Sequence, residues 1–316
     1  MKALQQFEII DKEINVHMKL SQLTTEQRNK NSMNLDQMTT IELLKTINDE
    51  DKKVASAVEG VLAKVSVAIE HIYKALADGG RLFYAGAGTS GRVGVIDASE
   101  CPPTFMTSPE MVQTVMAGGA DAFFHAVEGS EDNESQGEAD LKKKNFTNKD
   151  VVIGITASGR TPYPIGALKY ARSLGAYTIS LSCNKDSLIS SYADCEIEVI
   201  VGPEVLTGST RMKAATSHKM ILNMISTATM VRLGKVHENL MVDVHASNYK
   251  LKERAKRIIM EITKVSYGKA AEALLQTNHE VKPAIVMLEA GVTYEEAQNA
   301  IKQANGYVRE AIEFFS

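Results

Sequence analysis

Five short apolar runs recur along the first two thirds of the chain, each separated from the next by a segment with a helical pattern. The runs are residues 82–85, 112–117, 151–156, 177–182 and 196–201. The helical segments between them are expected near residues 92–99, 120–127, 165–174 and 188–191. Apolar strands that alternate with helices are typical of a doubly wound parallel sheet. We therefore predict an α/β fold in which helices cover both faces of a five-stranded parallel sheet, as three layers.

Helical patterns also precede the first strand. Residues 1–20 have the spacing of an amphipathic surface helix, and residues 23–38 are polar and irregular. Residues 40–76 predict two helices, with Asn48–Asp51 interrupting the first. In the second helix Val54, Val58 and further apolar residues share one stripe. We expect residues 1–50 to form a helical extension.

A long helix is expected after the sheet, at residues 210–233, with apolar residues on most of its faces. Because such a helix usually faces a partner subunit, we predict a homodimer. Residues 239–262 continue with a helical pattern, and residues 267–316 have the pattern of a small three-helix unit. The predicted domains are therefore the extension at 1–50, a ligand-binding domain at 51–265 and a C-terminal unit at 266–316.

Composition narrows the class of protein. The 316 residues carry a net charge of −4, which gives no electrostatic case for binding nucleic acid or an anionic membrane. No apolar run reaches membrane length, and acidic residues interrupt the first twenty positions, so no signal peptide is expected. The three cysteines have neither metal-binding nor paired spacing, which fits a reducing cytoplasm. We expect a cytoplasmic protein that acts on small molecules.

The first strand leads into a turn rich in glycine and hydroxyl groups, Gly86-Ala87-Gly88-Thr89-Ser90-Gly91. A helix is expected to begin there, and the first N–H groups of a helix bind anions because they lack internal partners. Gly88, Thr89 and Ser90 are therefore candidate phosphate-binding residues. Two prolines, Pro102 and Pro103, are expected to end this helix.

The same turn also matches the G-x-G-x-x-G pattern of dinucleotide-binding proteins. That interpretation requires an acidic residue at the end of the second strand, to bind the ribose hydroxyls. Here the second strand ends in Gly118-Gly119, and Glu110 precedes the strand. The pattern therefore does not favour a nicotinamide or flavin cofactor.

The third strand repeats the arrangement of the first. It leads into Thr156-Ala157-Ser158-Gly159-Arg160-Thr161, after which a helix begins. Hydroxyl groups at Thr156, Ser158 and Thr161, placed around Gly159, can surround phosphate oxygens. They could also only cap the helix, since Ser and Thr are good caps. Two such loops at one sheet edge favour a phosphorylated ligand.

Three stretches together resemble one family. They are GAGTSGR at 86–92 with DASECPP at 97–103, TASGRTPY at 156–163, and GPEVLTGSTRMK at 202–213. The sequence resembles the N-acetylmuramic acid 6-phosphate etherases, which belong to the sugar isomerase (SIS) domain superfamily and are relatives of the glucokinase regulatory protein. The resemblance runs from about residue 22 to the end of the chain.

This resemblance implies a reaction and a set of site residues. The lactyl ether at C3 of N-acetylmuramic acid 6-phosphate would be cleaved to N-acetylglucosamine 6-phosphate and D-lactate, in cell-wall amino-sugar recycling. No metal or other cofactor is expected. The two acid/base residues of the family fall on Glu100 and Glu131, and the resemblance adds Glu204 and Lys213 to the candidate substrate-binding residues.

The chemistry of the two carboxylates supports this assignment. The ether oxygen is a poor leaving group unless an acid protonates it as it departs. Removal of the hydrogen at C2, which the neighbouring aldehyde acidifies, needs a base. Glu100, beside Cys101 and two prolines, is the better candidate for the acid. Glu131 lies in an acidic run of the kind that is usually solvated. His125, His218 and His245 are alternative bases, each without a neighbouring catalytic group in the sequence.

Two other functions remain open. An aldose–ketose isomerase of sugar phosphates would share the fold and the phosphate loops, but it would not need a second acid beside the C3 ether. A non-catalytic sensor of sugar phosphates would resemble the glucokinase regulatory protein, which contains two such domains in one chain. The single domain with both glutamates argues against the sensor and favours a homodimer whose site lies near the subunit interface.

Overall fold

The structure is a computed structural model, and it describes residues 23–244 and 249–316. The helix expected within residues 1–20 lies outside this part. The described chain divides into two compact units. One unit contains the residues up to Ala68, Leu82–Val95 and Thr114–Asn223, and the other contains Ile69–Arg81, Ile96–Gln113 and Met224–Ser316. The predicted domain boundaries at 51 and 266 stay predictions.

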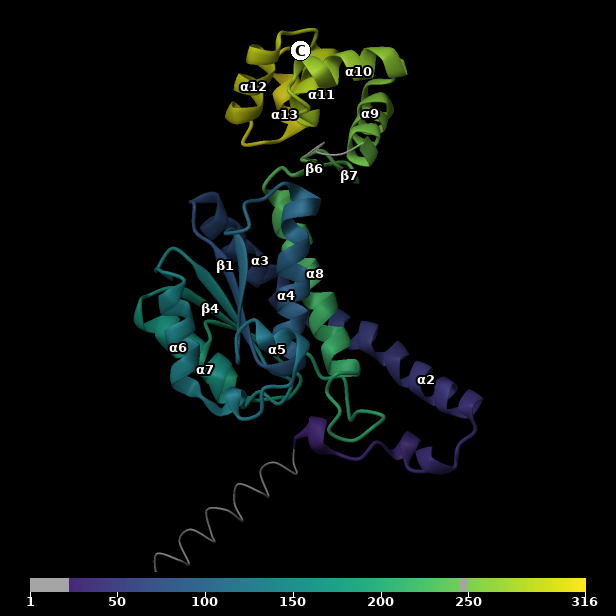
Figure 1. The fold of residues 1–316 in the computed structure, drawn as a ribbon, viewed down its shortest axis with the longest axis vertical. Coiled ribbons are helices and arrows are strands. Elements are labelled where there is room, and N and C mark those ends of the chain that lie inside the picture. Colours follow the sequence, from purple (N-terminus) through teal and green to yellow (C-terminus); the bar gives the residue numbers. More distant parts are fainter. Residues whose placement is uncertain (1–22, 245–248) are drawn as a thin grey trace, which may run out of the picture. The chain divides into compact units, whose positions relative to one another are not determined.

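A five-stranded parallel sheet forms the centre of the fold, as predicted. Its strands have the order β2-β1-β3-β4-β5, and Figure 1 labels β1 and β4 among them. They are β1 (Leu82–Gly86), β2 (Val112–Met116), β3 (Val151–Ile155), β4 (Tyr177–Ser182) and β5 (Cys195–Glu198). Every residue of β1 and β3 is buried, which explains why these strands are apolar throughout rather than alternating. The last strand ends at Glu198, three residues before the predicted end.

One face of the sheet is covered by α6 (Glu134–Lys143), α7 (Pro162–Ser173) and the short helix η5 (Leu188–Tyr192). The two α-helices approach each other closely because glycines stand at their contact. A Cβ at Gly166 would lie 1.9 Å from the carbonyl oxygen of Glu134, and one at Gly137 would lie 2.1 Å from that of Tyr163. The core on this face consists of Phe83, Ala85, Val115, Leu141, Phe146, Val152, Ile165, Ala167, Leu168, Ala171, Ala176 and Ile189.

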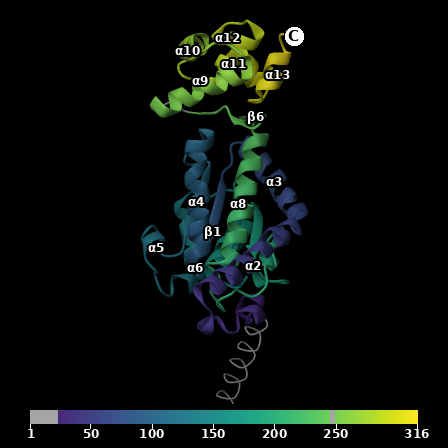
Figure 2. The same cartoon turned by 90° about the vertical axis from the view of Figure 1, so that its right-hand side faces the viewer.

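On the opposite face lies α4 (Gly88–Phe105), next to α8 (Lys213–Arg232) in both views (Figures 1 and 2). Gly94 of α4 packs on Tyr84 of β1, with its Cβ position 3.0 Å from the Tyr84 Cβ. The hydroxyl of Ser226 in α8 donates to Asp97 in α4 at 3.0 Å. The three-layer prediction is therefore confirmed.

The prolines of α4 do not end the helix where the sequence suggested. Pro102 and Pro103 lie inside its last turn, and the helix continues to Phe105. Each proline removes one intrahelical N–H bond, and the Cys101 thiol lies 3.4 Å from the carbonyl oxygen of Asp97 in the preceding turn. The chain leaves the helix at Met106, whose φ of +53° is left-handed.

The first described segment contains three short helices, η1 (Thr24–Glu26), η2 (Lys30–Ser32) and η3 (Leu35–Gln37), followed by α2 (Thr40–Glu59). The predicted interruption at Asn48–Asp51 is wrong, because α2 runs through it. Lys52 pairs with Asp49 at 2.7 Å, and Glu50 is buried against cations, so these polar residues stabilise the helix. The break comes instead at Gly60, before α3 (Leu62–Ala77).

Between β2 and β3 the predicted helix near 120–127 is much shorter than expected. Only α5 (Asp121–Phe124) forms there, and the short helix η4 (Ser130–Asp132) follows. Gly129, at φ +72°, takes the left-handed conformation just before η4. This irregular stretch carries Glu131.

The C-terminal segment begins with a hairpin rather than with the helix expected from residue 239. Strands β6 (Val236–His237) and β7 (Leu240–Met241) pair antiparallel, with Glu238 at φ +54° in the turn. Five helices follow and cluster together (Figure 2): α9 (Tyr249–Thr263), α10 (Tyr267–Gln276), α11 (Val281–Ala290), α12 (Tyr294–Gln303) and α13 (Val308–Glu313). Within the described residues, no helix is both long and apolar enough to span a membrane.

Candidate active site

A cavity of about 490 Å³ opens at the carboxyl ends of β1 and β3. This is the edge where parallel α/β sheets bind ligands, because the strand-to-helix loops meet there. The cavity is lined by Glu26, Ala87, Gly88, Thr89, Ser90, Glu131, Asp132, Ile155, Thr156, Ala157, Ser158, Arg160, Thr161, Pro162, Gly208 and Thr210. Six of the predicted substrate-binding residues and one predicted catalytic residue are in this set.

The first wall is the turn from β1 into α4. This turn requires glycine at two positions, because a Cβ at Gly86 would lie 2.9 Å from the Gly91 nitrogen and one at Gly91 would lie 2.8 Å from the Gly86 oxygen. The close approach places Gly88, Thr89 and Ser90 in the first turn of α4, on the cavity wall. Helix N-terminal N–H groups and two hydroxyls there form a favourable environment for an anion.

The second wall is the loop between β3 and α7. The hydroxyl of Thr156 lies 2.8 Å from that of Thr161 and 3.2 Å from that of Ser158. Gly159 is buried, with φ +73°, and a Cβ there would lie 2.3 Å from the Ser187 Cβ. Gly159 therefore shapes the loop and is not among the lining residues. Thr156, Ser158 and Thr161 thus line one cavity from one loop, and their role in binding phosphate stays a prediction.

Asn184, just after β4, braces this loop. It is 2% exposed, and its amide nitrogen lies 3.0 Å from the carbonyl oxygen of Ala157 and 3.3 Å from that of Ser158. The same amide nitrogen lies 3.2 Å from the Thr25 hydroxyl, and its oxygen accepts from the Thr24 N–H at 2.6 Å. Asn184 has no signal of this role in the sequence, since a lone Asn after a strand usually indicates only a turn.

The segment 23–38 was also missed as part of the site. Its helix η1 brings Glu26 to the cavity wall, where its carboxylate lies 3.8 Å from the Cβ position of Gly208. The Asn29 amide donates to the Pro203 carbonyl at 3.0 Å, and the Ser32 hydroxyl donates to the Val205 carbonyl at 2.7 Å. These bonds hold the loop 202–212 against the segment. Hydrophobic periodicity gave no signal for this role, because the segment works through polar contacts.

Glu131 lies in η4, exposed, and lines the cavity beside Gly88. It also lines a smaller neighbouring cavity of about 220 Å³, together with Gly88, Arg92 and His125. The carboxylates of Glu26 and Asp132 and the guanidinium of Arg160 contribute further charge to the large cavity. A substrate bound at the two hydroxyl loops would therefore extend toward carboxylate groups.

Glu204 and Lys213 do not line the cavity. Glu204 is buried and accepts from the backbone N–H groups of Lys213 at 3.0 Å and Ala214 at 2.9 Å, so it caps the start of α8. Burial raises the pKa of Glu204, although these two bonds oppose the shift. The ammonium of Lys213 pairs with buried Glu50 at 2.7 Å. Both residues therefore shape the loop 202–212, which contributes Gly208 and Thr210 to the cavity.

Glu100 is exposed on α4, twelve residues beyond Gly88. At 1.5 Å per residue, this spacing amounts to about 18 Å along the helix axis. Glu100 is not among the described residues that line the cavity.

The candidate histidine bases differ in environment. His218 is completely buried, its Nε2 lies 3.4 Å from the Cys183 sulfur, and burial lowers its pKa to about 4. It is therefore neutral at physiological pH and lies away from the cavity lining. His125 is exposed and lines only the smaller cavity. His245 lies outside the described residues.

Three protein-family models match parts of this chain. Residues 64–172 match the glucokinase regulatory protein N-terminal SIS domain, and residues 128–228 match the SIS domain. Residues 238–305 match the C-terminal lid domain of glucokinase regulatory protein. A phosphoheptose isomerase from Francisella tularensis shares the fold, with a TM-score of 0.50 and 16% identity over 61% of this chain and 100% of that one.

Two curated bacterial proteins are far more similar in sequence. The N-acetylmuramic acid 6-phosphate etherase of Bacillus subtilis is 55% identical over 298 residues, which cover 94% of this chain and 98% of the relative. The etherase of Bacillus pumilus is 56% identical over 293 residues, covering 93% and 97%. The chain therefore belongs to the N-acetylmuramic acid 6-phosphate etherase family.

Proposed function

We propose that this protein cleaves the D-lactyl ether of N-acetylmuramic acid 6-phosphate, giving N-acetylglucosamine 6-phosphate and D-lactate. The observation that carries the proposal is the cavity at the carboxyl ends of β1 and β3, where two hydroxyl-rich loops and Glu131 face the same space. The sequence identity to curated etherases over nearly the whole chain supports the choice of substrate.

The phosphate is assigned to the two hydroxyl loops. The first turn of α4, with Gly88, Thr89 and Ser90, supplies N–H and hydroxyl donors. The hydroxyls of Ser158 and Thr161 complete the cradle from the other side. Each hydrogen bond to the charged phosphate contributes on the order of 1.5–3 kcal/mol, so these contacts anchor the sugar by its C6 end.

The sugar then reacts in its open-chain form. A base removes the proton at C2, which the aldehyde at C1 acidifies, while an acid protonates the ether oxygen at C3. The C3–O bond breaks, D-lactate leaves, and a double bond forms between C2 and C3. Water then adds at C3 and a proton returns to C2. We assign Glu131 as the base, because it lines the cavity that holds the phosphate loops.

Glu100 is assigned as the acid, and its position links the mechanism to a second copy of the chain. About 18 Å along α4 separate it from the phosphate cradle at Gly88, which is longer than an amino-sugar phosphate. Ile96, one turn before Glu100, is 48% exposed. We propose a homodimer in which each cavity receives Glu100 from the other subunit. Light scattering that gave a single-chain mass of 34.4 kDa for the active enzyme would contradict this arrangement.

The reaction is assigned to the cytoplasm, as part of cell-wall amino-sugar recycling. Cys101, Cys183 and Cys195 are all buried and unpaired, which fits a reducing compartment. No cofactor is invoked, because each step needs only proton transfer and water.

The direct test is incubation of the purified protein with N-acetylmuramic acid 6-phosphate, followed by an assay for D-lactate with and without a chelator. Release of D-lactate is expected from the wild type in both conditions. Glu131→Gln should lower the rate by about 10²–10⁴-fold, whereas Glu110→Gln, an exposed acid before β2, should not change it. Conversion of an aldose phosphate to a ketose without lactate would indicate an isomerase, and binding without turnover would indicate a sensor.

A further inference from the structure

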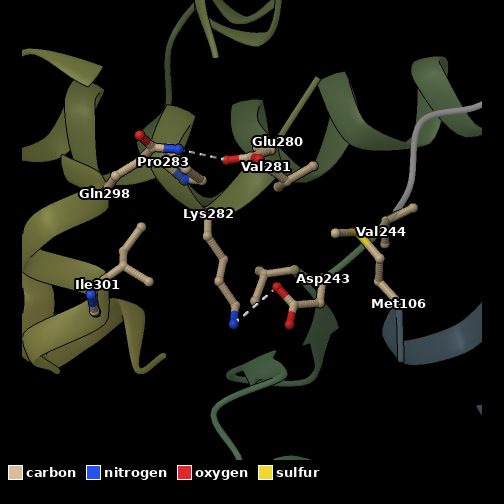
Figure 3. Close-up of a pocket in the computed structure, with 11 residues that line it drawn as sticks. Met106, Asp243, Val244, Glu280, Val281, Lys282, Pro283, Gln298 and Ile301 are labelled. Carbon is tan, nitrogen blue, oxygen red and sulfur yellow. Dashed lines mark hydrogen bonds and ion pairs between the residues drawn. The ribbon is translucent and has the colours of Figure 1, made fainter. Parts of the chain in front are cut away.

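A separate cavity of about 300 Å³ lies within the second compact unit, the one that contains Ile96–Gln113 and Met224–Ser316. It is lined by Met106, Val242, Asp243, Val244, Glu280, Val281, Lys282, Pro283, Gln298, Ile301 and Lys302 (Figure 3). None of these residues lines the proposed active site. Its volume equals that of about ten water molecules in the liquid, which is the size of a small organic molecule.

Most of the wall is apolar. Val242 and Val244 come from the segment that follows β7, and Val281 and Ile301 come from α11 and α12. The polar lining residues are Asp243, Glu280, Lys282, Gln298 and Lys302. A largely apolar cavity with a small number of fixed polar groups is the usual form of a small-molecule site.

The charged groups that line the cavity, together with Lys235 beside it, carry one excess positive charge. Asp243 pairs with two ammonium groups, that of Lys235 at 2.8 Å and that of Lys282 at 2.9 Å. The Lys282 side chain is only 9% exposed and extends from α11 toward Asp243 (Figure 3). One carboxylate thus balances one buried cation, Lys282, and one half-buried cation, Lys235, and burial lowers the pKa of Lys282 despite its partner. A second anion would relieve this imbalance.

The remaining charges do not remove the excess. Lys302 adds a cation at the exposed end of the lining, and Glu280 adds a carboxylate. Glu280 is bound by the Tyr294 hydroxyl at 3.2 Å and by the Gln298 amide at 3.4 Å. Lys282 is the second residue of α11, so the positive end of that helix dipole also adjoins the cavity.

We propose that this cavity binds a small organic carboxylate with a short, branched apolar body. The carboxylate would pair with Lys282, and the apolar part would pack against Val244 and Ile301. Inorganic anions do not fit this assignment, because the apolar wall would remain hydrated. Neutral molecules of the same shape do not fit it either, because they leave the buried cation without its second partner.

The proposal can be tested on the full-length protein with isovalerate as the probe. Ligand-observed NMR titration should give saturable binding, at least ten-fold tighter than that of isovaleramide, its neutral isostere, and of inorganic phosphate. Equal binding of isovaleramide would show that the ligand's negative charge is not recognised. Equal binding of phosphate would show that its apolar body is not recognised. Either result would overturn the proposal. A Kd for isovalerate above about 10 mM, which is a binding free energy weaker than about −2.7 kcal/mol, would overturn the proposed site altogether.

Two variants locate the binding. Lys282→Met removes the charge and leaves Asp243 paired with Lys235, and Ile301→Phe fills the cavity while keeping both ion pairs. Each should weaken isovalerate binding at least ten-fold, whereas Lys269→Met, an exposed lysine on α10, should not. Unchanged binding in Ile301→Phe would contradict the proposal even if Lys282→Met failed to fold. D-lactate release should remain in Ile301→Phe, which separates this test from that of the active site.

Discussion

The ammonium of Lys213 lies 2.7 Å from the carboxylate of Glu50, and the two side chains are 1% and 4% exposed. This buried pair joins the first residue of α8 to the middle of α2. The Asn31 amide donates to the same carboxylate at 2.8 Å, and Glu204 caps α8 beside it. The loop 202–212, which reaches the active-site cavity at Gly208 and Thr210, is thus fixed at its end by charges that lie away from the cavity.

Loss of this pair should destabilise the fold strongly. Glu50→Gln removes the carboxylate that pairs with the buried Lys213 ammonium, and breaking such a buried pair typically costs about 3–5 kcal/mol. Glu59→Gln, at an exposed position of the same helix, should change the free energy of unfolding by less than about 0.5 kcal/mol. Urea denaturation of both variants measures the difference, and equal stabilities would show that the pair contributes nothing.

The same pair predicts acid sensitivity. Burial alone would raise the pKa of Glu50, but hydrogen bonds from Lys213, Lys53 and Asn31 outweigh it and lower the pKa from 4.5 to about 2. Because the pKa is lower in the folded chain, the contribution is complete above pH 4.5 and is lost as the pH falls toward 2. Wild-type stability should therefore fall more steeply than that of Glu50→Gln across this window.

A second stability prediction concerns the contact of α6 with α7. Gly166→Ala would place a Cβ 1.9 Å from a backbone oxygen of α6, so the helices would have to separate, and we expect a loss of several kcal/mol. Gly268→Ala, in α10 with no atom within 4 Å of its Cβ position, should instead be neutral or stabilising by up to about 1 kcal/mol. Thermal unfolding that ranked the two variants in the opposite order would refute the packing argument.

Much of the fold could be predicted because its central strands, β1 and β3, are buried on both faces and are therefore unbroken apolar runs. The edge strand β5 alternates between buried and half-buried residues, and all five strands were predicted with errors only at their ends. The errors elsewhere arose where tertiary contacts outweigh local preference. Glu50 looks like part of a helix break until its buried partner Lys213 is known, and Pro102 and Pro103 look like a helix end although α4 continues to Phe105.

The site could be predicted only in part, for a related reason. Hydroxyls and glycines that follow a strand have a local signature, so Ser90 and Ser158 were identified with the cavity wall they occupy. Glu26 and Asn184 come from distant segments and act through single polar contacts, which leave no periodic pattern. The family motif predicts Glu204 and Lys213 as substrate-binding residues. In the structure Glu204 accepts from the backbone of Lys213, and the Lys213 ammonium pairs with Glu50, so neither residue lines the cavity.

The phosphate assignment predicts the behaviour of Ser158→Ala. The variant loses one hydrogen bond to a charged group, on the order of 1.5–3 kcal/mol, so the KM for N-acetylmuramic acid 6-phosphate should rise ten-fold or more. Ser173→Ala removes an exposed hydroxyl from the end of α7 and serves as the control. An unchanged KM in steady-state assays of Ser158→Ala would remove this residue from the site.

The brace formed by Asn184 predicts an indirect effect on the same site. Asn184→Ala removes the bonds to the carbonyls of Ala157 and Ser158, so the hydroxyl loop should lose its fixed geometry. We expect a ten-fold or greater rise in KM together with a loss of about 1–3 kcal/mol in stability. Asn299→Ala, exposed on α12, should alter neither. A loss of stability with an unchanged KM would reduce Asn184 to a purely structural residue.

Isotope labelling tests the central claim most directly, because elimination followed by addition of water fixes which bond breaks. When N-acetylmuramic acid 6-phosphate is cleaved in ¹⁸O-labelled water, mass spectrometry should find the label in the sugar, at C3, and none in the ether oxygen carried by D-lactate. In deuterated water, deuterium should appear at C2, and Glu131→Gln should abolish both this exchange and lactate release. Label in D-lactate instead of the sugar would mean attack on the lactyl side and would contradict the proposed elimination.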